Sequence, residues 1–192
     1  TILAAAKSVG ISIPTLCYLN LSDFGCVNTP SSCRMCLVEV EGRRNLAPAC
    51  VTTVADKMVI STNSVRALKT RKTMLELLLS DHPKECLTCQ KSGNCELQDL
   101  ADKFSIRDIK LKGEQSTYRL DISKSLIRDM DKCIMCRRCE TMCNEVQTVG
   151  VLSAINRGFE SVIATAMEIN LNDSVCTYCG QCAAVCPTGA LV

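Results

Sequence analysis

The spacing of apolar and polar residues predicts two helices in the middle of the chain. One apolar face follows the helical repeat through Val65, Leu68, Leu75 and Leu79. We expect this helix to span residues 64–79, with Asn63 or Ser64 as its N-cap, and to end where Pro83 interrupts the pattern. A second, shorter helix is predicted over residues 96–103. The two helices therefore flank a short polar loop.

The rest of the chain divides into short apolar runs and polar loops, which is typical of an α+β protein. Short strands are predicted over residues 149–155, 161–164 and 190–192. Residues 105–123 are polar and irregular, and we interpret them as a connector that crosses the surface. The predicted units are residues 1–62, 63–104, the connector 105–123, and 124–192.

The composition indicates that side chains alone cannot build the core. Only 3% of the 192 residues are aromatic and tryptophan is absent, whereas there are 16 cysteines. We therefore expect bound metal to contribute to folding, and the metal-free protein to be largely unfolded. The net charge of +2, from 22 basic and 20 acidic residues, does not indicate a nucleic-acid binder. No apolar stretch approaches the ~20 residues of a membrane span.

Eight cysteines form two copies of the spacing C-x2-C-x2-C-x3-C in the last third of the chain. In bacterial ferredoxins, three close thiolates of such a run bind one 4Fe-4S cluster and the fourth binds the other cluster. This crossing rule predicts one 4Fe-4S cluster on Cys133, Cys136, Cys139 and Cys186, and a second on Cys143, Cys176, Cys179 and Cys182. Disulfides are the alternative, but the repeated spacing and the lack of a secretory signal argue against them.

A third group, Cys86, Cys89 and Cys95, offers three thiolates where a cluster needs four ligands. His82 is the only histidine, and it completes the spacing H-x3-C-x2-C-x5-C. We interpret these four residues as the ligands of a third 4Fe-4S cluster. A neutral imidazole makes the ligand set less negative by one charge, which favours the reduced state, as in Rieske centres. A Cys3His zinc site is the alternative.

The N-terminal cysteines predict a 2Fe-2S cluster. Cys17, Cys33, Cys36 and Cys50 combine a close pair with a distant fourth ligand, as in plant-type ferredoxins, although the first gap is longer. The extra Cys26 lies in that gap, and we expect it to be an unligated thiol on an inserted loop that serves as a small apolar residue.

Several basic residues lie beside the predicted ligands, and we expect them to be solvated; the alternative is that they raise the cluster potentials or bind an acidic partner. They are Arg34, Lys132, Arg137 and Arg138. The sequence has neither a G-x-G-x-x-G turn nor a P-loop, so nicotinamide and flavin are expected to bind elsewhere. Thiolate ligands of this number favour a reducing compartment, and we expect a cytoplasmic protein.

The same motifs resemble the N-terminal electron-relay region of iron-only (FeFe) hydrogenases, especially the large subunit of electron-bifurcating, NAD(P)-linked enzymes. The resemblance lies in Ile13-Pro-Thr-Leu-Cys-Tyr18, in residues 33–40, in the His82–Cys95 motif, in the tandem cysteine runs and in residues 155–160. The order also resembles the large iron–sulfur subunit of NADH dehydrogenase complex I and the alpha subunit of NAD-dependent formate dehydrogenases.

The resemblance implies three domains in an α+β chain. They are an incomplete β-grasp 2Fe-2S ferredoxin-like domain (1–62) whose N-terminal hairpin is missing, a small helical His/Cys3 4Fe-4S domain (63–104), and a two-cluster 4Fe-4S bacterial-ferredoxin-like domain (124–192). The family continues beyond the position of Val192 into the domain that holds its H-cluster, so we expect a piece of a longer subunit.

The function implied is the electron-transfer part of an oxidoreductase within a hetero-oligomer. Electrons would pass between flavin- and NAD(P)-binding iron–sulfur subunits, or ferredoxin, and the H-cluster, and no catalytic residue is expected in this chain. The alternatives are the relay region of a formate dehydrogenase and a stand-alone ferredoxin-like carrier.

Overall fold

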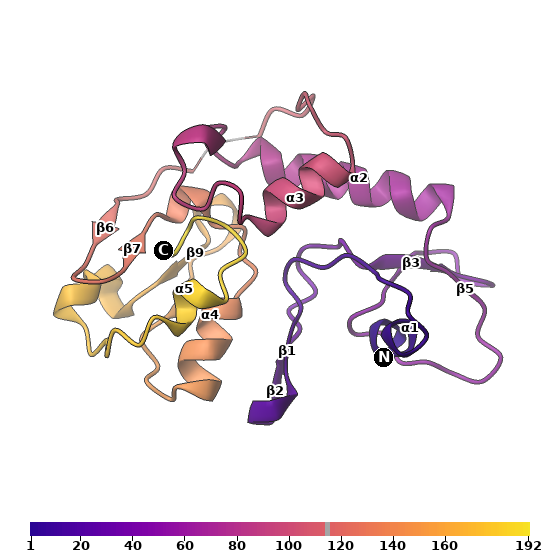
Figure 1. Ribbon diagram of the computed structural model, residues 1–192, viewed down its shortest axis with the longest axis horizontal. Coiled ribbons are helices and arrows are strands. Elements are labelled where there is room, and N and C mark those ends of the chain that lie inside the picture. The colour runs from indigo at the N-terminus through magenta and orange to yellow at the C-terminus, as the bar shows by residue number, and fades with distance from the viewer. Residues whose placement is uncertain (114–115) are drawn as a thin grey trace.

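The computed structural model describes residues 1–113 and 116–192 and contains both helices and small antiparallel sheets (Figure 1). The helices are α1 (Ile2–Ser8), α2 (Val65–Ser80), α3 (Glu96–Lys103), α4 (Arg138–Thr141) and α5 (Gln181–Ala184). The strands are β1 (Leu19–Leu21), β2 (Cys26–Asn28), β3 (Leu37–Val40), β4 (Ala47–Pro48), β5 (Ile60–Ser61), β6 (Asp121–Ile122), β7 (Ile127–Arg128), β8 (Ser153–Ile155) and β9 (Val162–Ala164). Within the described residues, no helix has the length and apolar character needed to span a bilayer.

The N-terminal unit packs α1 against a three-stranded sheet. Thr1 caps α1, because its Oγ1 accepts a hydrogen bond from the backbone N–H of Ala4 at 3.3 Å. The sheet has the order β4-β3-β5, and both pairings are antiparallel. A separate hairpin joins β1 to β2, with Cys26 opposite Leu21. The expectation that Cys26 lies on a loop was therefore wrong, because the inserted segment pairs with itself as a hairpin.

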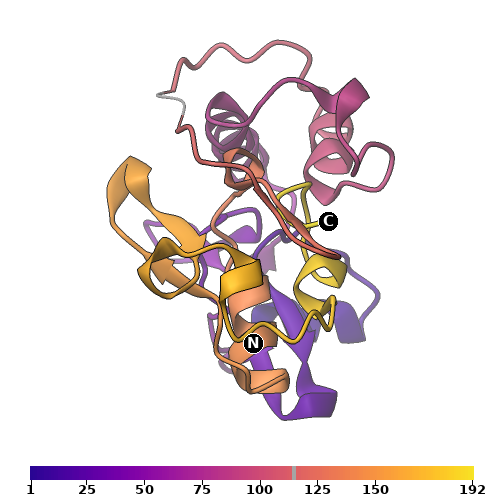
Figure 2. The ribbon, with the colours of Figure 1, turned by 90° about the vertical axis from the view of Figure 1, so that its left-hand side faces the viewer.

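The two predicted helices of the middle segment are present with almost the predicted ends. α2 begins after Ser64, whose Oγ accepts a hydrogen bond from the N–H of Ala67 at 3.2 Å, and it ends at Ser80 before Pro83. α3 has the predicted bounds. Figures 1 and 2 both show α2 and α3 on the same side of the molecule, above α4 and α5.

The buried face of α2 differs from the predicted apolar face in its first half. Val65 is 83% exposed and Leu68 is 39% exposed. The residues that face inward along α2 are instead Ala67, Arg71 and Leu75. This part of α2 packs against β3. Ala67 and Arg71 are buried there in place of the aliphatic residues that were predicted.

The C-terminal unit contains two hairpins, β6–β7 and β8–β9. β8 is shorter than the predicted strand 149–155, because the preceding residues turn inward, where Val151 and Leu152 are buried. The final segment pairs with β7: the N–H of Ile127 donates to the carbonyl of Val192 at 2.7 Å. β6 lies within the predicted connector 105–123, of which residues 114–115 fall outside the described residues.

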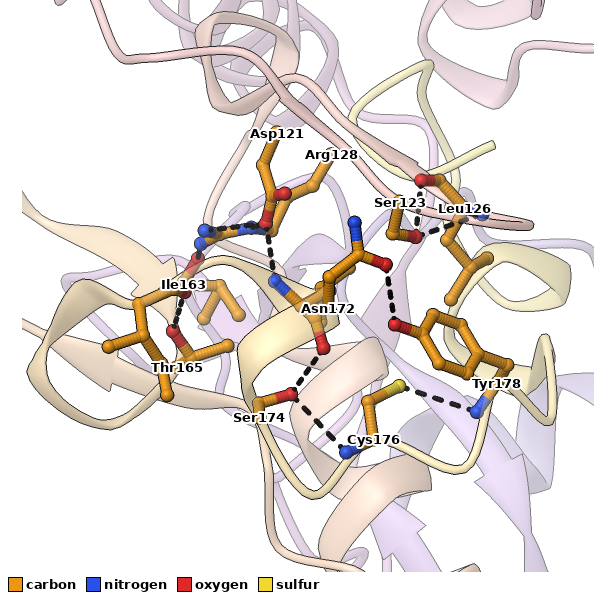
Figure 3. A network of polar contacts seen from close by, with 12 residues as sticks. Asp121, Ser123, Leu126, Arg128, Ile163, Thr165, Asn172, Ser174, Cys176 and Tyr178 are labelled. Carbon is orange, nitrogen blue, oxygen red and sulfur yellow. Dashed lines mark hydrogen bonds and ion pairs between the residues drawn. The ribbon is translucent and has the colours of Figure 1, made fainter.

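A buried ion pair fixes the β6–β7 hairpin to its neighbours (Figure 3). Asp121 and Arg128 face each other across the hairpin, with side chains 3% and 9% exposed and Nη2 of Arg128 3.1 Å from Oδ2 of Asp121. The same carboxylate oxygen accepts the N–H of Leu171 at 3.0 Å, and Arg128 Nη1 donates to the carbonyl of Ile163 at 3.3 Å. The pair thus holds three segments of the C-terminal unit together.

Residues 1–113 and 116–192 form three hydrophobic cores, and one of these cores contains residues from every unit. The first belongs to the N-terminal sheet and α1, and another belongs to the C-terminal unit. The remaining one, called here the central core, consists of Leu16, Cys17, Cys33, Met35, Leu75, Cys95, Leu97, Ile134 and Cys136. Predicted ligands of three different clusters therefore share one apolar environment.

Candidate metal centres

The four predicted N-terminal ligands form one buried group of thiols. Cys17, Cys33, Cys36 and Cys50 are between 1% and 3% exposed. The Sγ atoms of Cys36 and Cys50 are 3.3 Å apart, and Cys17 and Cys33 form a second hydrogen-bonded pair. The two pairs also interact electrostatically, because Cys17 acts on Cys50 and Cys33 acts on Cys36. Cys26, in β2, is only half-buried.

Hydrogen bonding within this group favours the ionised form of one thiol in each pair. The hydrogen bond from Cys33 lowers the pKa of Cys17 to about 5, and the bond from Cys36 lowers the pKa of Cys50 to about 7. The donors Cys33 and Cys36 have raised pKa values because they keep the shared protons. A group that already carries thiolates suits a metal centre, since the thiolate is the ligating form.

The second group surrounds a hollow beside the loop that joins α2 to α3. Its lining includes all four predicted ligands, His82, Cys86, Cys89 and Cys95. Pro83 ends α2 so that His82 enters this hollow, and Cys95 lies immediately before α3. The loop between them is open to solvent: Cys86 is exposed and Leu87 is 97% exposed.

The environment of His82 fits a ligand. Its Nδ1 atom is buried and has no hydrogen-bond partner among the described residues. Burial lowers the pKa of His82, and the charge of Lys132 lowers it further, so the neutral imidazole is favoured. Neutral imidazole is the form that binds metal. Gly189 closes the hollow, where an added Cβ would lie 2.7 Å from Cys89 Sγ.

The tandem cysteines come together in the crossed arrangement. The lining of one hollow includes Cys143, Cys176, Cys179 and Cys182. Cys186, the last of the second run, instead acts electrostatically on the three thiols of the first run, Cys133, Cys136 and Cys139. Each run therefore sends its fourth thiol to the other group. Among the described residues, no three His, Cys, Asp or Glu side chains are close enough to hold a single metal ion.

Burial makes four of these thiols hard to ionise. It raises the pKa of Cys133 to about 11, that of Cys136 to about 12 and that of Cys182 to about 11. The pKa of Cys139 shifts in the same direction for the same reason. A bound cation would offset this penalty, which fits thiols whose ionised form is held by iron.

The two cysteine loops share one backbone design. Met135 and Tyr178 occupy equivalent positions and have positive φ angles of 51° and 55°. Their N–H groups donate to Cys133 Sγ and Cys176 Sγ, both at 3.4 Å. The left-handed residues turn each loop back so that a backbone N–H reaches the preceding thiol. Hydrogen bonds to sulfur are also one way in which a protein adjusts a cluster potential.

Two of the basic residues near the ligands are not solvated as expected. Arg138 is buried, because its guanidinium binds both carboxylate oxygens of Glu96 at 2.5 and 2.9 Å. Lys132 is about a quarter exposed and pairs with Asp129 at 2.6 Å. Arg34 is exposed as expected, and Arg137 is half-exposed and pairs with Glu140.

Asn28 joins two centres, a role that no sequence pattern indicates. Its buried amide donates to the carbonyl of Cys17 at 2.5 Å and to that of Cys136 at 3.0 Å. Its Oδ1 accepts a hydrogen bond from Thr141 at 2.7 Å. One side chain thus connects the backbones of two predicted ligands, of which Cys136 is 108 residues away from Asn28 along the chain.

Three family descriptions match consecutive parts of the chain. Residues 1–65 match a 2Fe-2S iron-sulfur cluster binding domain. Residues 71–110 match the iron-sulfur binding region of NADH-ubiquinone oxidoreductase-G. Residues 132–190 match a 4Fe-4S dicluster domain. Most of the chain is therefore similar to iron–sulfur binding regions. The matched segments contain all the donors described above.

The chain also has relatives that are oxidoreductase subunits. It is 68% identical over 193 residues to the NADP-reducing hydrogenase subunit HndD of Solidesulfovibrio fructosivorans. It is 40% identical over 195 residues to an NADH-quinone oxidoreductase subunit of Rhizobium meliloti. Both matches cover 100% of the chain, which spans only 33% and 22% of those proteins.

The fold of the chain also has a solved counterpart. The crystal structure of NAD+-reducing NiFe hydrogenase in the H2-reduced state matches it with a TM-score of 0.88 and 29% sequence identity. That match covers 100% of this chain and 79% of the other. The predicted resemblance to hydrogenase and complex I subunits is therefore confirmed.

Proposed function

We propose that the chain relays single electrons through one 2Fe-2S and three 4Fe-4S clusters. The observation that carries the proposal is the arrangement of 15 cysteines and one histidine in four groups, three of which meet in the central core. When bound, iron–sulfur clusters accept and release one electron at a time. The chain itself would hold the ligands at fixed separations and keep water out of the space between them.

The proposed ligands follow the four groups. The 2Fe-2S ligands are Cys17, Cys33, Cys36 and Cys50; those of the three 4Fe-4S clusters are His82, Cys86, Cys89 and Cys95, then Cys133, Cys136, Cys139 and Cys186, then Cys143, Cys176, Cys179 and Cys182. The matched 2Fe-2S and 4Fe-4S families support these types of cluster. Spacing, burial and the unpartnered Nδ1 of His82 support the individual ligands.

The positions of the ligands suggest how the route runs. Cys33 of the first group, Cys95 of the second and Cys136 of the third lie in the central core, so apolar side chains separate these groups. Cys139 of the third group is in electrostatic contact with Cys182 of the fourth. Electrons would enter at the first or second group, of which the second has the exposed loop, and leave through the fourth.

We further propose that the complete protein is an FeFe hydrogenase subunit that carries its H-cluster in a further domain. The match to the NADP-reducing hydrogenase subunit HndD supports the hydrogenase assignment. The partners would be flavin- and NAD(P)-binding iron–sulfur subunits or ferredoxin, in a cytoplasmic hetero-oligomer, where a reducing environment preserves thiolate ligands. A NiFe hydrogenase has a similar region, so the residues encoded after Val192 are the decisive sequence.

Metal analysis of the purified subunit tests the relay. This region should account for about 14 irons per chain, and electron paramagnetic resonance (EPR) should show one 2Fe-2S signal and several 4Fe-4S signals. Stoichiometric zinc with little iron would contradict the proposal. In the complete enzyme, hydrogen gas should reduce these clusters. Reduction by formate instead would identify a formate dehydrogenase, and reduction by neither would indicate a carrier.

A further inference from the structure

Arg71 is a buried cation in the middle of α2. Its side chain is among the most deeply buried in the described residues, with 1% of the residue exposed. Nε and Nη2 donate to the carbonyl of Leu37 at 2.9 and 2.7 Å, and Nη2 also donates to the carbonyl of Thr62 at 2.8 Å. These carbonyls accept hydrogen bonds from Nε and Nη2 but carry no charge. The guanidinium is always protonated, so its positive charge is left to be compensated.

No carboxylate compensates that charge within the described residues. The ion pairs there involve other arginines and Lys132, and none of them includes Arg71. Arg71 binds the carbonyl of Leu37, and the residue immediately before Leu37 is Cys36, whose thiol would be negatively charged as a cluster ligand. Burial lowers the pKa of Arg71, and the charge of an ionised Cys36 opposes this shift. The guanidinium therefore sits beside the N-terminal group of thiols.

We infer that Arg71 is the counter-ion of the N-terminal 2Fe-2S site and raises the reduction potential of its cluster. The inference rests on the proposed 2Fe-2S ligands. One-electron reduction adds a negative charge to the cluster, and a nearby buried cation stabilises that charge more strongly than a solvated one. By binding the carbonyl of Leu37, Arg71 also positions the strand that begins immediately after Cys36.

Substitutions at position 71 can test the charge of Arg71 separately from its hydrogen bonds. Glutamine at this position can donate to one of the two carbonyls but has no charge. Lysine keeps the charge and loses the forked geometry. The next residue, Lys72, is exposed on the same helix, so replacing it removes an equal charge from a solvated position. The three changes together distinguish a buried counter-ion from a structural clamp and from a general effect of charge.

The experiment is an EPR-monitored redox titration of the 2Fe-2S signal in the complete subunit. Arg71→Gln should lower the ratio of reduced to oxidised cluster at least tenfold at a given potential. For a one-electron couple this corresponds to a midpoint that is more negative by about 59 mV. Arg71→Lys should retain most of the wild-type midpoint, and Lys72→Gln should leave it unchanged. An unchanged midpoint in Arg71→Gln, or an equal shift in Lys72→Gln, would overturn the inference.

Loss of the cluster is also informative. If Arg71→Gln fails to assemble the 2Fe-2S centre, Arg71→Lys decides the outcome. A normal signal in Arg71→Lys supports the counter-ion, whereas loss of the signal in both variants assigns Arg71 a purely structural role and overturns the inference. A wild-type protein without any 2Fe-2S signal would instead refute the proposed function itself, so the two failures are distinguishable.

Discussion

The buried pair Asp121–Arg128 allows a quantitative test of how the C-terminal unit is held together. Replacing Arg128 with methionine keeps a long apolar side chain and removes the guanidinium. Oδ2 of Asp121 then loses Nε at 3.2 Å and Nη2 at 3.1 Å, and keeps only the N–H of Leu171 at 3.0 Å. An almost inaccessible carboxylate would be left with one neutral donor.

The expected cost follows from the burial of that carboxylate. Removing one partner of a buried ion pair costs about 3–5 kcal/mol, because the other charge stays in a medium of low dielectric. Urea lowers the stability of small proteins by about 1–3 kcal/mol per molar, so the unfolding midpoint should fall by at least about 1 M. The double variant Asp121→Asn/Arg128→Met should lose less than the sum of the single changes, since it leaves no unpaired charge.

Anaerobic urea unfolding, followed by circular dichroism on samples of equal iron content, measures these differences. Arg107→Met is the matched control, because Arg107 pairs with Asp102 at 3.4 Å where the two side chains are 81% and 75% exposed. This control should change stability by no more than about 0.5 kcal/mol. An Arg128→Met variant that unfolds at the same urea concentration as Arg107→Met would refute the reasoning.

Three further predictions concern the proposed ligands. Cys17→Ser should abolish the 2Fe-2S EPR signal and Cys26→Ser should preserve it, because Cys26 lies in a hairpin outside the thiol group; loss of the signal in Cys26→Ser would contradict the assignment. His82→Cys adds a negative charge to its ligand set, so redox titration should give a more negative midpoint for that cluster, and an equal midpoint would count against ligation by His82. Removal of iron by a chelator should abolish the cooperative thermal transition in circular dichroism, and an unchanged transition would show that the metal is not needed for folding.

Local rules predicted the features that depend on neighbouring residues in the chain. The ends of α3 and the Ser64 cap of α2 came from periodicity and capping chemistry alone. The grouping of Cys186 with Cys133 also followed from spacing, because the geometry of a cluster limits where its ligands can lie. These features do not depend on which distant segment packs against them.

Features that depend on distant partners were missed. Arg71 faces inward because the carbonyls of Leu37 and Thr62 lie where α2 meets the N-terminal sheet. Its spacing of four residues from both Ala67 and Leu75 was a weak signal, but a charged residue at that position is normally expected to face solvent. Asn28 likewise gains its role only when Cys136 comes beside it.

The central core has a consequence for any attempt to divide the chain. Its apolar side chains come from all three segments that match a family. We therefore expect that none of these segments folds alone. A truncated protein that stops before α2 would turn Leu16 and Met35, both fully covered in the intact molecule, towards water. Such a fragment would aggregate unless a substitute surface shielded it. Replacing one segment with that of a homologous protein therefore also requires replacing the central-core residues that pack against it in the other segments.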